Sequence, residues 1–127
     1  MATRPRPTSP HLDVYRLTLT MAMSIMHRIT GIAQYLGTLL LVAWLLAAAL
    51  GGAELAAVNG FFGSWLGQVI LFGYTWSLFH HMLGGLRYFT WDFILAMDPA
   101  GREILVRLQV IGSVTLTLLA WALFVWF

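Results

Sequence analysis

Two short stretches of this sequence place polar and ionisable side chains inside otherwise apolar runs. The first, "MSIMHRITG" (residues 23–31), contains Ser24, His27 and Arg28. The second, "FHHMLGGLRYFTWD" (residues 79–92), contains two histidines, an arginine and an aspartate. An ionisable side chain at membrane depth is costly, so its presence indicates a functional site by default.

The first stretch can bind a small carbonyl compound. Ser24 and Arg28 are four residues apart and therefore share one face of a helix, with His27 beside that face. A hydroxyl and a guanidinium on one face can donate hydrogen bonds to a carbonyl oxygen at the membrane surface. In the alternative interpretation, Arg28 only reaches the lipid phosphates and marks the start of a membrane span.

The second stretch contains a candidate ligand for a planar metal group. Arg87 follows His81 by six residues, which is about 9 Å along a helix axis, so the histidines lie inside the bilayer but not at its centre. Adjacent residues point about 100° apart, so His80 and His81 cannot both bind one flat ligand axially. Only one of them is the ligand candidate.

Small residues line the helix face that carries His81, namely Gly73, Ser77, Gly84 and Gly85. Such a column lets a broad planar group, or another helix, approach the backbone closely. A helix-packing face with a histidine hydrogen-bonded across it is the alternative. Two histidine-bearing spans near the arginine-rich side favour haem, because imidazole binds haem iron and arginine or histidine can pair with its propionates.

The composition shows where these residues must be positioned. Apolar residues make up 60% of the 127 residues and charged residues 9%, and the mean hydropathy is +0.81, which is typical of a membrane protein. We expect a subunit whose substrate chemistry lies on another polypeptide. The absence of cysteine excludes disulfides and cysteine-ligated iron–sulfur clusters. The arginines do not form a basic patch, so no nucleic-acid partner is expected.

Three uncharged runs predict an all-α membrane protein with three transmembrane helices. The runs comprise 25 residues between Arg28 and Glu54, 32 residues between Glu54 and Arg87, and the chain after Arg107. Each reaches the roughly 20 residues that a helix needs to cross a bilayer, and none alternates as barrel strands do. We expect an N-terminal arm over 1–22 and a single transmembrane domain over 23–127, with spans near 23–50, 63–90 and 103–126.

The distribution of arginine predicts the orientation. The N-terminal arm carries Arg4, Arg6 and Arg16, and the second connection, "WDFILAMDPAGREILVR", carries Arg102 and Arg107. The first connection, "GGAELAAVNGFFG", carries only Glu54. The N-terminus is therefore expected in the cytoplasm of a bacterium, at the inner membrane, with the mitochondrial matrix as the alternative. Asp98 and Pro99 form a suitable N-cap and first residue for the third span.

These motifs, in this order and spacing, resemble the cytochrome b (large anchor) subunit of succinate dehydrogenase, the succinate:quinone oxidoreductase of respiratory membranes. They are "RPTSPHL" followed by "VYR", then S-x-x-H-R-x-[ST]-G, then H-x(3)-G-[IL]-R-x(3)-W-D. The resemblance covers residues 4 to about 92 through motifs and the whole chain through its three-span pattern.

The resemblance implies an anchor subunit of respiratory complex II. With a second small anchor subunit it would bind one b-type haem and ubiquinone beneath the iron–sulfur subunit, receiving electrons from succinate oxidised at the flavoprotein subunit. Matching implies that His81 is the axial ligand of the haem iron, that the partner anchor supplies the other ligand, and that His80 stands where the family needs no histidine. Ser24 and Arg28 match the quinone pocket. His27 matches a residue near the haem propionates, where Arg28 can also serve.

Two residues near the end of the second motif carry further expectations. Asp92 can help to deliver protons to the quinone, or can pair with Arg87 as a helix-end carboxylate. The family often has histidine where this chain has Tyr88, whose phenol, with a reference pKa of about 10, cannot replace imidazole as a proton shuttle at neutral pH. Tyr88 and Trp91 also fit an aromatic belt at the membrane interface.

Three other functions remain open from the sequence. The chain can anchor a fumarate reductase that uses menaquinone, because direction depends on the quinone potential. It can be a structural anchor without haem. It can also be a self-contained haem protein in which His27 and His81 both bind one iron.

Overall fold

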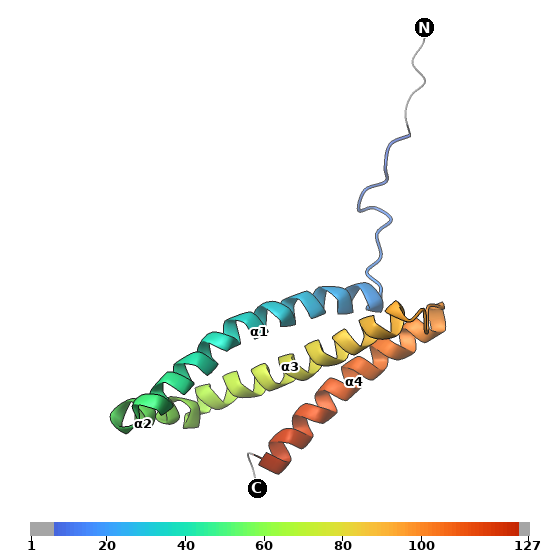
Figure 1. Ribbon diagram of the computed structural model, residues 1–127. Helices are drawn as coiled ribbons and strands as arrows, with labels where there is room; N and C mark the ends of the chain where they lie inside the picture. The colour runs from blue at the N-terminus through green and yellow to red at the C-terminus, as the bar shows by residue number, and fades with distance from the viewer. Residues whose placement is uncertain (1–6, 125–127) are drawn as a thin grey trace.

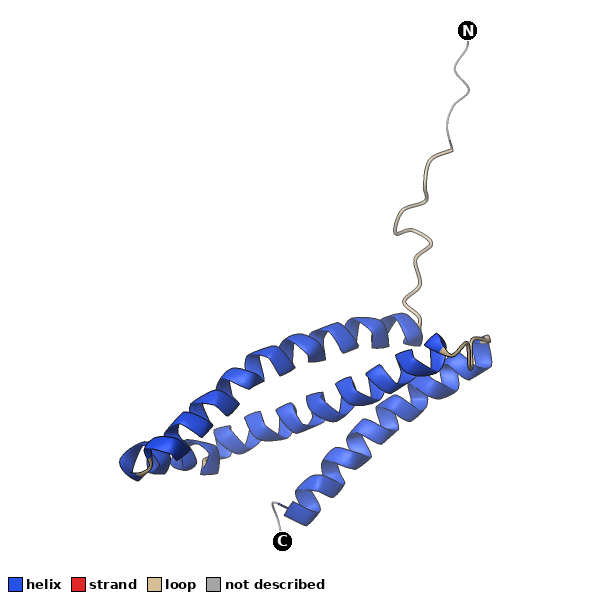
Figure 2. Cartoon of the chain, in the orientation of Figure 1, coloured by secondary structure: helices blue, strands red, loops and turns tan. Residues whose placement is uncertain are grey.

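The described part of the chain, residues 7–124, contains four α-helices in a computed structural model (Figure 1). The helices are α1 (Leu19–Leu50), α2 (Gly52–Gly63), α3 (Trp65–Asp92) and α4 (Pro99–Phe124). Figure 2 shows only helix and loop over these residues. The long helix α3 packs against both α1 and α4, and the short α2 lies across the end where α1 meets α3. The expectation of an all-α protein is confirmed.

The described residues contain two or three candidate membrane spans, depending on how α2 and α3 are counted. α1 and α4 are each long and apolar enough to cross a bilayer. α2 and α3 meet the same condition only together, as a pair bent by 76°. The long helices lie where the three spans were expected, within a few residues, while the count of three stays a prediction.

Helix α1 begins four residues before the expected start at 23. The side-chain oxygen of Thr18 accepts a hydrogen bond from the backbone N–H of Met21 at 3.4 Å, which caps the first turn. The 32 residues of α1 correspond to a length of about 48 Å, more than the roughly 30 Å of a hydrocarbon core. Helix α1 must therefore tilt in the bilayer or extend beyond the hydrocarbon core at one or both ends. Ser24 lies near the N-terminal end of this helix.

The first connection is a helix, where the sequence had indicated only a glycine-rich link. Gly51 ends α1 with a φ of 70°, in the left-handed region that glycine tolerates. The following residues include several alanines and have Glu54 in the first turn, both of which favour a helix. Ser64 then caps α3 by accepting from the N–H of Gly67 at 3.2 Å. These two caps turn the chain sharply without a long loop.

The start of α4 confirms the cap expected from the sequence. Pro99 is the first helical residue, and the carboxylate of Asp98 accepts a hydrogen bond from the N–H of Gly101 at 3.0 Å. The turn before it is tight, because Ile94 and Ala96 have φ values of 59° and 52°. α3 and α4 are thereby held as an antiparallel pair.

The interior of the bundle is polar, and its outer surface is apolar. Among the residues whose burial is described, seven polar or charged residues are buried, against three hydrophobic ones. The polar set is Thr30, Ser77, His80, Arg87, Gln109, Ser113 and Thr117. In a bilayer the outer surface is in contact with lipid or another apolar helix, and polar groups find partners between helices. The buried polar set therefore locates the site.

Candidate functional site

His80 lies between α3 and α4 and is almost fully buried, with 2% of its surface exposed. Its Nε2 is 3.0 Å from the amide nitrogen of Gln109, and its Nδ1 is 3.3 Å from the hydroxyl of Ser113. An amide nitrogen can only donate, so Nε2 accepts and the ring proton must be on Nδ1. Both ring nitrogens are engaged by α4, and the lone pair of Nε2, the one that could bind a metal, accepts the hydrogen bond from Gln109. His80 joins two helices.

His81 faces α1 and has a different environment. Its Nδ1 is 3.1 Å from the backbone carbonyl oxygen of His27 and 3.3 Å from the hydroxyl of Thr30. The carbonyl can only accept, so Nδ1 carries the proton and Nε2 keeps its lone pair. An imidazole oriented by a carbonyl at one nitrogen and free at the other is the usual form of a metal-binding histidine. The residues present therefore fit axial haem ligation through Nε2 of His81.

The ring of His27 stacks on the ring of His81. Their centroids are 4.0 Å apart and their planes differ by 5°. Two axial ligands of one iron must point their nitrogens at each other across the metal, which rings stacked face to face cannot do. This arrangement disfavours the self-contained haem protein. Gly31 lies on the same side, where a Cβ atom would come within 3.0 Å of the His81 ring.

The column of small residues divides into a packed half and an open half. Ser77 accepts a hydrogen bond from the side chain of Gln34 at 3.0 Å, across the α1–α3 contact. A Cβ on Gly84 would lie 2.4 Å from Nδ1 of His27. At Gly73 and Gly85, in contrast, no atom of the described residues lies within 4 Å of such a Cβ. Helix packing accounts for Ser77 and Gly84 only. A broad group can therefore still approach α3 at Gly73 and Gly85.

We expect Gly84→Ala to destabilise the α1–α3 contact by about 1–3 kcal/mol, the usual cost of overpacking. The added methyl would collide with the His27 ring and would lie 3.0 Å from the side-chain nitrogen of Gln109. Thermal unfolding of the purified complex measures the effect. Gly60→Ala in α2 is the control, because a Cβ there meets nothing within 4 Å. Equal melting temperatures for the two variants would contradict this packing role.

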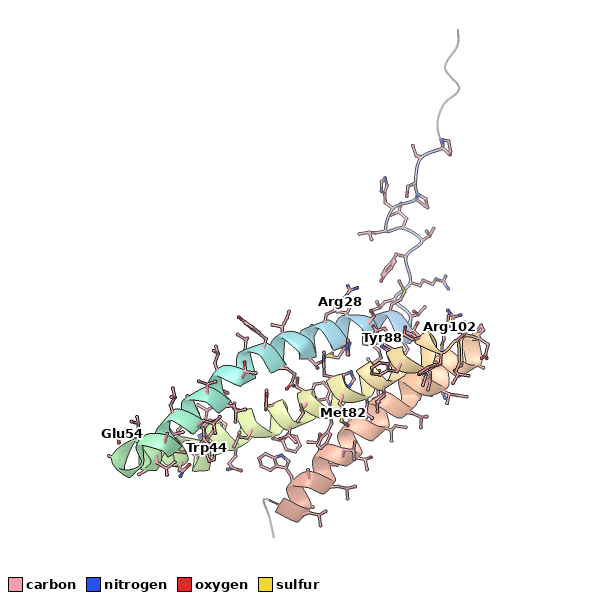
Figure 3. The ribbon with its side chains drawn as sticks, in the orientation of Figure 1. Arg28, Trp44, Glu54, Met82, Tyr88 and Arg102 are labelled. Atoms are coloured by element: carbon pink, nitrogen blue, oxygen red, sulfur yellow. The ribbon has the colours of Figure 1, made fainter. Side chains whose placement is uncertain are left out.

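Ser24 lines a cavity of about 310 Å³ at the end of the bundle where α1 starts, α3 ends and α4 starts. The lining residues are Thr20, Met21, Ser24, Trp91, Met97 and Arg102. Arg102 was not singled out in the sequence, where it appeared only as an orienting charge. The position of Arg102 in the first turn of α4 is the one feature of the sequence that could have indicated its place in the cavity lining. Arg28 is exposed on the outer side of α1 (Figure 3), away from this cavity.

Tyr88 points into the bundle, unlike a residue of a lipid-facing aromatic belt. Its hydroxyl oxygen lies 3.4 Å from the hydroxyl oxygen of Ser24. Its ring packs edge-on against the ring of His27, with centroids 5.1 Å apart, and against Trp91 at 5.5 Å. Tyr88 therefore connects the cavity at Ser24 with the stacked histidines.

Asp92 does not pair with Arg87 among the described residues. The one ion pair there joins Arg107 to Glu103. Residues five apart point about 140° apart on a helix, and Arg87 is buried while Asp92 is exposed. The expectation of a helix-end pair is not met within this chain. Asp92 is exposed on the surface of this chain, and its role in proton delivery stays a prediction.

Comparison with known protein families agrees with the motifs. The model of the succinate dehydrogenase/fumarate reductase transmembrane subunit family matches residues 2–120. The succinate dehydrogenase cytochrome b556 subunit of Paracoccus denitrificans is 40% identical over 119 residues, covering 94% of this chain and 92% of the relative. The cytochrome b556 subunit of Rickettsia felis is 30% identical over 116 residues, covering 91% and 90%.

A mitochondrial relative gives the same result. The succinate dehydrogenase cytochrome b560 subunit of Sus scrofa is 36% identical over 118 residues, covering 87% of this chain and 69% of the relative. Similarity of this extent, with the family match over nearly the whole chain, establishes membership. The chain belongs to the succinate dehydrogenase/fumarate reductase transmembrane subunit family, as a cytochrome b subunit that anchors complex II in the membrane.

Proposed function

We propose that this chain binds one b-type haem, shared with a second small anchor subunit, and ubiquinone at the end of the bundle near Ser24. Electrons from succinate, oxidised at the flavoprotein subunit and relayed by the iron–sulfur subunit, would reduce the quinone there. The hydrogen bond from Nδ1 of His81 to the His27 carbonyl, at 3.1 Å, is the observation that carries the haem part.

In this proposal His81 would bind the haem iron through Nε2, and the partner anchor would supply the other ligand. His27 would lie near the propionates, with Arg28 able to serve at the same edge. A haem bound there would supply one-electron storage or transfer. This chain's own contribution is to hold the His81 ring. The His27 carbonyl fixes its tautomer, and the stacked His27 ring limits its rotation.

The quinone part of the proposal rests on Ser24 and the cavity that it lines. A hydroxyl donor fixed in a cavity of about 310 Å³ can hold a quinone carbonyl and stabilise negative charge that develops on its oxygen. Arg28 would reach either the quinone or a propionate in the assembled complex. Protons must come from water, so the site belongs at the arginine-rich end, where Asp92 is exposed and can help to deliver them.

The proposed setting is a bacterial inner membrane with the N-terminus in the cytoplasm. The partners are the second anchor, the iron–sulfur subunit, the flavoprotein subunit and lipid. Two relatives of bacterial origin support this location, and the excess of arginine at one end supports the orientation.

The test is a reduced-minus-oxidised spectrum and a quinone assay of the complex purified through this chain. We expect a b-type absorption band and succinate-dependent reduction of ubiquinone. A complex without the band would instead be a haem-free anchor. Faster turnover from reduced menaquinone to fumarate than from succinate to ubiquinone would indicate a fumarate reductase.

A further inference from the structure

Arg87 is a buried charge without a hydrogen-bond or ion-pair partner in the described part of the chain. Only 2% of its surface is exposed, and none of its three guanidinium nitrogens makes a hydrogen bond there. A buried, uncompensated charge is strongly unfavourable, so native proteins pair such groups. The pairing group must come from outside the described residues.

The immediate neighbours of Arg87 are aromatic. Its guanidinium carbon lies 5.2 Å from the centroid of the Tyr88 ring and 5.0 Å from that of Trp91. These rings attract the cation but do not use its N–H groups. The acids nearest in sequence are engaged elsewhere or exposed, since Asp98 caps α4 and Asp92 lies at the surface.

The unpartnered buried atoms around Arg87 are mostly donors. They are its three nitrogens, Nε1 of Trp91, Nδ1 of His27, which can donate or accept, and a single acceptor, Oε1 of Gln109. Arg87 and Gln109 also line a small cavity of about 150 Å³ between α3 and α4. A set with one positive charge and several unpaired N–H groups matches an anion with two oxygens, which a guanidinium binds in a bidentate manner.

We propose that Arg87, with Trp91 beside it, binds a carboxylate supplied by another component of the assembled complex. A haem propionate and an acidic side chain of another subunit share this chemistry. The propionate is favoured by position, because Arg87 lies about 9 Å along α3 from His81, toward the arginine-rich end. The Tyr88 ring beside Arg87 also touches His27, which stacks on His81. The propionate source rests on the function proposed above, whereas the carboxylate site does not.

Redox-difference infrared spectra of the whole complex test this inference, with the haem propionates labelled with ¹³C through a haem precursor. We compare wild type with Arg87→Gln and Arg87→Lys. Arg107→Gln is the control, since Arg107 is exposed and paired with Glu103. We expect the labelled propionate band to shift in Arg87→Gln, to shift less in Arg87→Lys, and to stay in place in the control.

A shift in an unlabelled carboxylate band alone upholds the site and assigns its carboxylate to a subunit. No shift in any carboxylate band overturns the inference. A wild-type complex without haem contradicts the proposed function, while the unlabelled bands still report on the carboxylate site.

Thermal unfolding of Arg87→Met provides a second test. If a carboxylate pairs with Arg87, removing the guanidinium leaves that carboxylate unpaired and lowers the melting temperature of the complex. If Arg87 is truly unpaired, removing a buried charge raises the melting temperature, and the inference fails. Should Arg87→Met not assemble, the infrared comparison with Arg87→Lys, which keeps the charge, still decides.

Discussion

We expect His81→Ala to abolish the b-type absorption band of the purified complex, whereas His80→Gln leaves the band in place. The two histidines are adjacent in the sequence but point to different helices. His81 has Nδ1 on the His27 carbonyl of α1 and Nε2 free of hydrogen bonds in the described structure. His80 has both nitrogens bonded to side chains of α4. Only His81 offers a lone pair to iron.

The expected losses differ in kind. Alanine at 81 would remove the iron ligand that we propose for this chain, so haem retention should fall to background. Glutamine at 80 keeps a donor and an acceptor near Gln109 and Ser113, and we expect it to cost about 1–3 kcal/mol of stability through imperfect hydrogen bonds. Its melting temperature would therefore fall while the absorption band per complex stays unchanged.

Reduced-minus-oxidised spectra, normalised to the flavin content of each preparation, measure both variants. Normalisation separates loss of haem from loss of assembled complex. A band lost in His80→Gln but kept in His81→Ala would reverse the assignment. A band kept in both would mean that no histidine of this pair binds the iron.

The outline of the fold could be predicted from the sequence because uncharged length and helix caps are local properties. Asp98 and Pro99 alone indicated where α4 begins, and the structure confirms it. The helical form of the first connection was missed, because its glycines suggested a loop. The alanines between Gly52 and Gly60, together with caps at Gly51 and Ser64, outweigh them.

The site could be predicted only in part, since burial depends on which helix lies opposite. The angle between adjacent residues indicated that His80 and His81 would separate, but the sequence does not specify that α4 covers His80. The sequence predicted that Arg87 marks the membrane edge. In the structure Arg87 is buried between α3 and α4, because Gln109 and the residues around it on α4 lie against it. Tyr88 turned inward because Ser24 and His27 lie opposite it on α1.

We expect Ser24→Ala to lower kcat/KM for ubiquinone by about 10- to 100-fold while the haem band is retained. A fixed hydrogen-bond donor to a developing negative charge raises kcat by up to about 100- to 1,000-fold in well-studied sites. We expect a smaller factor here, because the cavity at Ser24 has an exposed edge. Succinate-dependent ubiquinone reduction measures the effect, with succinate oxidation by a soluble acceptor as the internal reference. Thr115→Ala, an exposed hydroxyl position on α4, is the control.

Arg28→Ala, measured beside Ser24→Ala, separates the two ligands proposed for Arg28. If Arg28 touches the quinone, its variant resembles Ser24→Ala, with lost activity and an unchanged haem spectrum. If Arg28 holds a propionate, the haem midpoint potential of Arg28→Ala becomes more negative, because a positive charge near the iron favours the reduced state. The quinone kinetics of this variant then change less.

Unchanged activity in Ser24→Ala would remove the hydroxyl from the quinone site. The lining of the cavity would then leave Arg102 as its one charged donor, since Arg28 lies on the outer side of α1.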